Sequence, residues 1–276
     1  MNDVVHDDST GRDFHIGGNE AGLSPEEQFE QLSWYIHEHY PRPEADADID
    51  RWVGMLPDRI THASMLMLGS AVDHAMPGVA YLGDVHMSPL ENLPAVQFSP
   101  SAPSGRWAIS LHGGAFRRGS GIALDNAWRP EVAAAAELSG TTIIDVDYPL
   151  LPASVDDMLT PIHEAISYAR SAGATHITAW GASAGAALAV LSHPLVDALL
   201  LTRPQFDTSA LGLALPAPEL WPSTCIQVGL RDTTVKRWQA AEDVSIVKEY
   251  LAEHLISTPE VARQRIRDAA DFLKGL

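Results

Sequence analysis

Apolar runs alternate with amphipathic segments along the second half of the chain. The runs rich in Val, Ile, Leu, Thr and Trp are typical of buried strands. They are TTIIDVDY (141–148), ITAW (177–180), VDALLL (196–201), TCIQVGL (224–230) and VSIVKEYL (244–251). Helical patterns lie at about 127–138, 154–171, from 184 onward, 234–242 and 259–274. This alternation predicts an α/β fold with a mostly parallel, doubly wound sheet.

The pattern in the first third of the chain is different. Residues 1–22 are polar and contain glycine, which predicts a mobile tail. Residues 23–78 are predicted to be helical and are a candidate cap. The first helix begins at Ser24, which can form a capping box with Glu27, and the second covers about 49–76. Short β-like runs follow at VAYLGDVHM (79–87), AVQFS (95–99) and RWAISL (106–111).

Composition restricts the classes of function. The 276 residues, 46% of them apolar, suffice for a full core. The chain has 18 Lys and Arg against 36 Asp and Glu, and its formal charge of −18 would repel nucleic acid and anionic membrane surfaces. The lone Cys225 excludes an intramolecular disulfide framework and a multi-cysteine metal site. An acidic N-terminus and the lack of a long apolar run favour a cytoplasmic protein.

The segment HITAWGASAGAALAVL (176–191) places a single hydroxyl between glycines. An apolar run leads into Gly181 and an alanine-rich helix follows from Ala184, so the G-x-S-x-G pattern lies in a strand–turn–helix context. This context predicts that Ser183 is a nucleophile on a tight turn. The alternative is a serine that only begins a helix.

A serine nucleophile needs a base, an acid that orients the base, and N–H donors for the oxyanion. His112-Gly113-Gly114 follows a predicted strand directly, and two glycines let the backbone approach a substrate closely. We therefore expect Gly113 and Gly114 to donate, with the amide of Ala184 as a third donor. The ring of His112 is expected to brace this loop.

Three segments carry a family resemblance. HGGAF (112–116), DVDYPLLPASVDDMLTPIHEAISYA (145–169) and GASAGA (181–186) resemble the hormone-sensitive-lipase-like branch of the α/β-hydrolase esterases. The resemblance implies an α/β-hydrolase catalytic domain over 79–276 and hydrolysis of carboxylic esters with small acyl groups. It implies no cofactor and no metal.

The base and acid follow from the order Ser, Asp, His that this fold uses. Only one histidine lies beyond residue 193, and it is His254, after the last predicted strand. Asp232 follows the preceding strand and is the expected acid, while Asp207 is a rival. The family usually has H-G-F around the base, whereas this chain has Leu255-Ile256 after His254.

Other functions remain open from the sequence. An arylformamidase-like amide hydrolase would use the same residues, and a non-catalytic ligand-binding protein could share the fold. His37 and His39 point about 200° apart on a helix, so they are not expected to share a metal ion. The apolar positions in 49–76 can close a pocket or form a homodimer interface.

Overall fold

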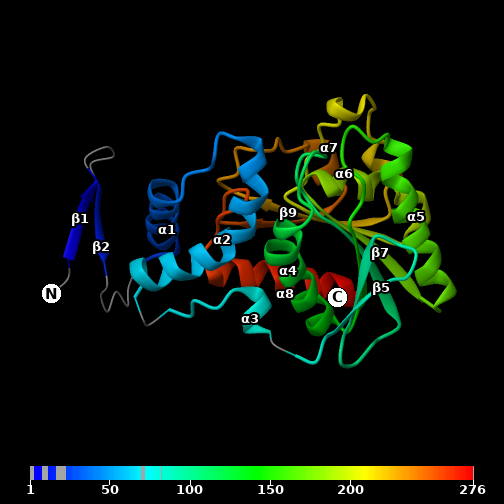
Figure 1. Ribbon diagram of the computed structural model, residues 1–276, viewed down its shortest axis with the longest axis horizontal. Helices are drawn as coiled ribbons and strands as arrows, with labels where there is room; N and C mark the ends of the chain where they lie inside the picture. Colours follow the sequence, from blue (N-terminus) through cyan, green and yellow to red (C-terminus); the bar gives the residue numbers. More distant parts are fainter. Residues whose placement is uncertain (1–2, 8–11, 17–22, 70–71, 82, 276) are drawn as a thin grey trace.

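An eight-stranded sheet forms the centre of the molecule in this computed structural model (Figure 1). The residues described are 3–7, 12–16, 23–69, 72–81 and 83–275. The strands lie in the order β10-β9-β8-β7-β5-β6-β4-β3, with every neighbouring pair from β10 to β6 parallel and the pairs of β4 antiparallel. Their bounds are β3 (His86–Pro89), β4 (Ala95–Ser99), β5 (Arg106–Leu111), β6 (Thr142–Val146), β7 (His176–Ala182), β8 (Ala198–Thr202), β9 (Ser223–Gly229) and β10 (Ile246–Tyr250).

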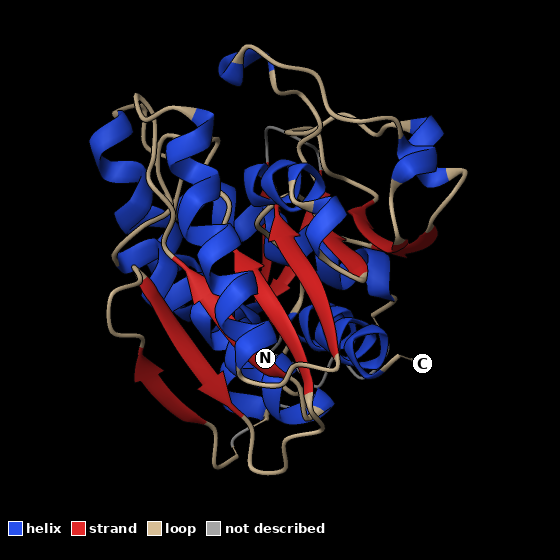
Figure 2. Cartoon of the chain, turned by 90° about the vertical axis from the view of Figure 1, so that its right-hand side faces the viewer, coloured by secondary structure: helices blue, strands red, loops and turns tan. Residues whose placement is uncertain are grey.

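Helices cover both faces of this sheet (Figure 2). Alternate strand residues point to opposite faces, so Ile109 and Leu111 of β5 join one core while Ala108 joins the other. The first core is closed by α5 and α6, and the second by α4 and α8. These helices are α4 (Arg129–Ser139), α5 (Val155–Ser171), α6 (Ala184–Leu191) and α8 (Pro259–Lys274). Shorter pieces are α3 (Pro77–Ala80), η1 (Leu124–Trp128), η2 (His193–Leu195), η3 (Ser209–Leu211), η4 (Pro218–Leu220) and α7 (Gln239–Glu242).

The N-terminal helices form a separate layer, to the left of the sheet in Figure 1. Helix α1 (Pro25–His39) begins with the predicted capping box between Ser24 and Glu27. Helix α2 (Asp46–Met67) is shorter than expected and is followed by Gly69 in a left-handed conformation (φ 76°). The two helices share a small core made of Leu32, Ile36, Leu56, Ile60 and Ala63, with Ile256 from the C-terminal part of the chain.

The predicted tail over 1–22 is described in part. Residues Asp3–Asp7 (β1) and Arg12–Ile16 (β2) pair as an antiparallel ribbon, which the sequence reading did not predict. The rest of that segment lies outside the described residues, and its mobility stays a prediction.

Two further sequence-based elements were wrong in extent. The run 79–87 was expected to be a strand, but Pro77 begins the short helix α3 and the strand starts only at His86. The helix expected over 234–242 is confined to Gln239–Glu242. The terminal helix is confirmed over 259–274. Within the described ranges, no helix is both long and apolar enough to cross a bilayer.

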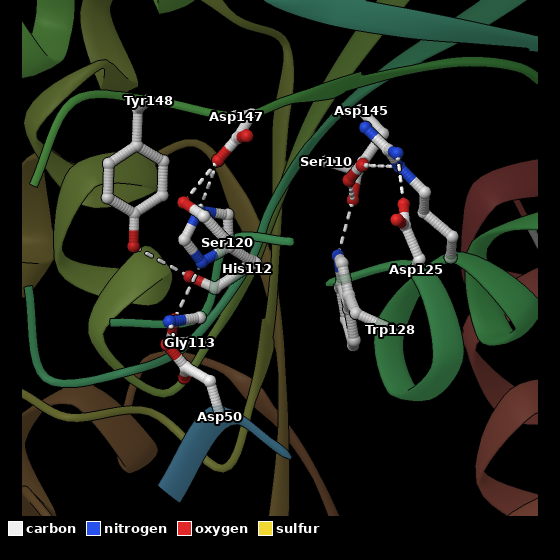
Figure 3. A network of polar contacts seen from close by, with 12 residues as sticks. Asp50, Ser110, His112, Gly113, Ser120, Asp125, Trp128, Asp145, Asp147 and Tyr148 are labelled. Atoms are coloured by element: carbon white, nitrogen blue, oxygen red, sulfur yellow. Dashed lines mark hydrogen bonds and ion pairs between the residues drawn. The ribbon is translucent and has the colours of Figure 1, made fainter. Parts of the chain in front are cut away.

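One carboxylate lies in the middle of the sheet. Asp145 of β6 is fully buried and accepts hydrogen bonds from Ser110 Oγ (2.8 Å) and Arg129 Nε (3.0 Å). Burial raises the pKa of Asp145 despite the opposing charge of Arg129. Ser110 Oγ in turn accepts from the indole N–H of Trp128 (2.8 Å), as Figure 3 shows. The network therefore fixes the position of the Trp128 ring.

Replacing Arg129 with Met should leave the charge of Asp145 buried without its counter-ion. We expect the free energy of unfolding at pH 7 to fall by about 3 kcal/mol, measured by urea denaturation. The control Arg170→Met removes an exposed pair with Asp197 and should cost less than about 1 kcal/mol. Equal losses in the two variants would contradict this account of Asp145.

Candidate active site

Ser183 lies on the turn that joins β7 to α6. Its backbone has φ 48° and ψ −115°, a conformation that residues other than glycine rarely adopt. Its amide donates to the carbonyl of Thr202 (2.9 Å), and its carbonyl accepts from the amide of Gln205 (3.0 Å). These bonds hold the strained residue at the carboxyl end of β7.

The glycines on either side allow this turn to form. A Cβ on Gly181 would lie 2.4 Å from the Cα of Ala186, and one on Gly185 would lie 2.3 Å from the carbonyl oxygen of Leu111. Both distances are far shorter than van der Waals contact. The G-x-S-x-G spacing is therefore required because the helix must start directly against the strand.

His254 connects Ser183 to Asp232. Its Nε2 lies 3.0 Å from Ser183 Oγ, and its Nδ1 lies 2.7 Å from Asp232 Oδ2. The three residues follow the carboxyl ends of β7, β9 and β10, which are parallel and end at one edge of the sheet. The rival Asp207 is exposed and accepts from the amide of Ser209. The structure thus brings together the three residues that the sequence predicted.

The environment of Asp232 keeps its carboxylate ionised. Burial tends to raise the pKa, but the hydrogen bond and charge of His254 and the amides of Thr234 and Val235 outweigh it. The pKa of Asp232 is therefore below its ordinary value. The amide of Thr234 donates at 2.8 Å, and the Asp232 side chain is only 4% exposed. A buried anion beside Nδ1 favours the tautomer with its proton on Nδ1, which leaves Nε2 able to accept the proton of the serine hydroxyl.

The predicted donor loop lies against the serine. A Cβ on Gly113 would lie 3.1 Å from Ser183 Cβ, while Gly114 has φ 119° and a Cβ there would lie 1.9 Å from the carbonyl oxygen of Arg118. Within the described part of the chain, the amides of Gly113, Gly114 and Ala184 donate no hydrogen bond. They remain the candidate donors to a negatively charged oxygen that forms beside Ser183.

The ring of His112 contacts this loop. Its buried ring stacks on Tyr148 with centroids 4.3 Å apart, and its Nδ1 lies 2.6 Å from the carbonyl oxygen of Gly113 (Figure 3). The hydroxyl of Tyr148 donates to the carbonyl of His112 (2.8 Å). Asp147 lies 3.4 Å from His112 Nε2 and accepts from Ser120 Oγ (2.6 Å). His112 therefore shapes the backbone and does not reach the serine hydroxyl.

A cavity of about 200 Å³ opens in front of Ser183 and His254. Part of its wall comes from α2, through Ile49, Trp52 and Val53. These positions are spaced i, i+3 and i+4, so they share one face of the helix. The other walls include Gly113, Gly114, Ala123, Ala127 and Trp128. The N-terminal helices thus cover a site that is built at the ends of the sheet strands.

Sequence reasoning missed several residues of this cavity. The apolar stripe of α2 was a usable signal for Trp52, but nothing local indicated Trp128 or Arg203. Arg203 follows β8 with φ 49°, lines the cavity, and donates through Nη1 to the carbonyl oxygen of His254. Burial and the nearby charge of Arg265 lower the pKa of Arg203 to about 10, so it stays cationic at neutral pH.

Among the described residues, no group of three or more His, Cys, Asp or Glu side chains is arranged to hold a metal ion. His37 contacts Glu253 (2.9 Å), and the ring of His39 lies against that of Tyr35.

Cys225 is buried in β9, and burial raises the pKa of its thiol to about 11.

Comparisons with known proteins give the fold. No protein-family model matches the chain, and no curated protein matches its sequence. Three solved structures each match 92% of it. An esterase from the bacterial hormone-sensitive lipase (HSL) family has 17% identity, a TM-score of 0.62 and 99% of its own chain covered. An arylesterase has 18% identity, a TM-score of 0.60 and 98% covered, and an esterase of Pyrobaculum calidifontis has 13% identity, a TM-score of 0.60 and 99% covered. The chain has the α/β-hydrolase fold, and the sequence-based prediction of that fold is confirmed.

The strain at Ser183 predicts an unusual stability effect. Ser183→Ala keeps a Cβ at φ 48°, whereas Ser183→Gly removes it. We expect the glycine variant to be more stable than the alanine variant by about 1 kcal/mol, after allowing for the greater entropy of glycine in the unfolded chain. Thermal unfolding of the two variants measures the difference. A less stable glycine variant would show that the turn is not strained.

Asp232 should also give a pH-dependent contribution to stability. Because its pKa is lowered in the folded chain, its ionised form stabilises the fold above the unfolded value of about 3.9, and this contribution is lost at lower pH. The stability of the wild type relative to Asp232→Asn should therefore shrink below about pH 4. Urea denaturation across this range tests the sign, and a constant difference would exclude it.

Proposed function

We propose that this protein is a serine carboxylesterase that hydrolyses small acyl esters. The observation that carries the proposal is the imidazole of His254, hydrogen-bonded to Ser183 Oγ (3.0 Å) and to the buried carboxylate of Asp232 (2.7 Å). Base, nucleophile and orienting acid are in the arrangement that activates a serine hydroxyl. The solved structures with the same fold are described as esterases.

Acylation begins at the serine hydroxyl. Ser183 Oγ attacks the ester carbonyl carbon as its proton passes to Nε2 of His254, and Asp232 stabilises the imidazolium that forms. The carbonyl oxygen becomes an oxyanion and binds the amides of Gly113, Gly114 and Ala184. The intermediate then collapses, the C–O bond to the alcohol breaks, and His254 returns the proton to the leaving alkoxide.

Water completes the cycle. His254 takes a proton from a water molecule, whose oxygen attacks the acyl carbon, and a second tetrahedral intermediate forms in the same donor pocket. Its collapse releases the carboxylic acid and returns the proton to Ser183 Oγ. This chemistry requires no cofactor and no metal ion.

The N-terminal segment 23–78 acts as a cap in this proposal. Ile49, Trp52 and Val53 of α2 line the cavity that contains Ser183, and Trp128 also lines it. A small cavity with mostly apolar walls limits the water around the oxyanion and suits a short acyl group. The cytoplasmic location and the homodimer stay predictions from the sequence.

A fluorophosphonate probe tests the proposal directly. It should label Ser183 covalently, and His254→Ala should reduce both labelling and the kcat for p-nitrophenyl acetate by about 10³-fold or more. The control His86→Ala changes an exposed histidine on the edge strand β3 and should leave both unchanged.

Two results would overturn it. Labelling that persists unchanged in His254→Ala would exclude His254 as the base. Turnover of N-formyl aryl amides without turnover of p-nitrophenyl acetate would replace the esterase with an amide hydrolase.

A further inference from the structure

The loop that carries His254 is a tight turn between β10 and α8. The amide of Glu253 donates to the carbonyl of Ile256 (2.9 Å), and Ala252 forms an isolated bridge with Ser257. The turn presents the imidazole to Ser183, but these internal bonds do not fix where the turn sits relative to the sheet. That position depends on what the turn contacts.

Helix α1 holds the residue just before the base. Ser33 Oγ donates to Glu253 Oε1 (2.5 Å), and His37 Nε2 lies 2.9 Å from Glu253 Oε2. Ser33 and His37 are four residues apart, so both face the loop from one side of α1. A serine inside a helix usually bonds to the carbonyl four residues earlier, whereas Ser33 reaches across to another segment. Ser33 is buried, and the Glu253 side chain is only 26% exposed.

The residues after the base are attached to the same layer. Ile256 is buried in the small core of α1 and α2, and Leu255 packs against that core while also lining the cavity. This explains why the chain has Leu255-Ile256 where the esterase family usually has glycine and phenylalanine. The apolar pair is the part of the loop that the N-terminal helices cover.

We infer that Ser33, His37 and Glu253 are positioning residues for His254, so that α1 adds a second attachment of this loop to the one that Arg203 and the amide of Arg231 provide. This inference rests on the proposed function. Glu253 is one residue from His254, and a shift of the loop by 1 Å would lengthen the 3.0 Å contact with Ser183 beyond a hydrogen bond. A misplacement of that size costs about 100-fold in rate.

Removing the carboxylate should therefore lower kcat and leave substrate binding intact. For Glu253→Ala we expect kcat for p-nitrophenyl acetate to fall about tenfold, with KM within about twofold of the wild type. Fluorophosphonate labelling of Ser183 should slow by the same factor. Glu253→Gln keeps an oxygen acceptor for Ser33 and should recover most of the rate. The matched control is Glu38→Ala, which removes an exposed carboxylate from α1 and should behave as wild type.

A second readout does not depend on turnover. The proton in the short His254 Nδ1–Asp232 Oδ2 contact should give a downfield NMR resonance, which we expect to shift or broaden in Glu253→Ala and to stay unchanged in Glu38→Ala. If Glu253→Ala does not fold, Ser33→Ala removes one bond only, and its kcat should fall about threefold.

The outcomes separate the two proposals. A folded Glu253→Ala variant with wild-type kcat, labelling rate and resonance would overturn the positioning role and leave the esterase intact. A fall in kcat/KM that comes from KM alone would also overturn it, because Glu253 would then affect substrate binding. If the wild type neither hydrolyses esters nor is labelled, the esterase proposal fails, and the resonance alone decides whether α1 positions the imidazole.

Discussion

The site depends on one strained residue held where three parallel strands end. Ser183 has a positive φ that its own side chain disfavours, and it is fixed there by its hydrogen bonds to the carbonyl of Thr202 and from the amide of Gln205. Because Gly181 and Gly185 have no side chains, α6 can start directly against β7 and the carbonyl of Leu111. This turn places the hydroxyl and the start of α6 at the carboxyl end of β7, against the loop that contains Gly113.

Several charged side chains are buried in this strongly acidic protein. Asp145 is paired with Arg129, and Glu131 forms a bidentate pair with Arg265. Arg203 donates to the carbonyl oxygen of His254. Such groups are costly to bury without a partner, and each of them has one. Asp145 holds Ser110 and, through it, the Trp128 ring, while Arg203 holds the backbone of His254.

The features encoded locally were predictable from the sequence. The turn at Ser183 and the loop at Gly113 and Gly114 are short motifs. Their glycines are required because a Cβ at those positions would come too close to neighbouring atoms. Asp232 and His254 were expected from the order Ser, Asp, His along the chain and from the single histidine beyond residue 193, and both lie beside Ser183 in the structure.

Contacts between distant segments were not predictable in this way. No local pattern indicates that Ser33 meets Glu253, that Trp128 is fixed through Ser110, or that Arg203 reaches the carbonyl of His254. The strand expected over 79–87 failed for a related reason. Its apolar residues suit a strand or a short helix, and Pro77 at the first helical position favours the helix.

The contact between α1 and the loop that carries His254 also has a consequence for the order of folding. Ser33 and Glu253 are separated by 220 residues, so their meeting closes a very long loop. Contacts of such high sequence separation tend to form late in folding. A newly synthesised chain would thus form the Ser183 turn, whose partners Thr202 and Gln205 are close in sequence, well before α1 docks on the loop that carries His254.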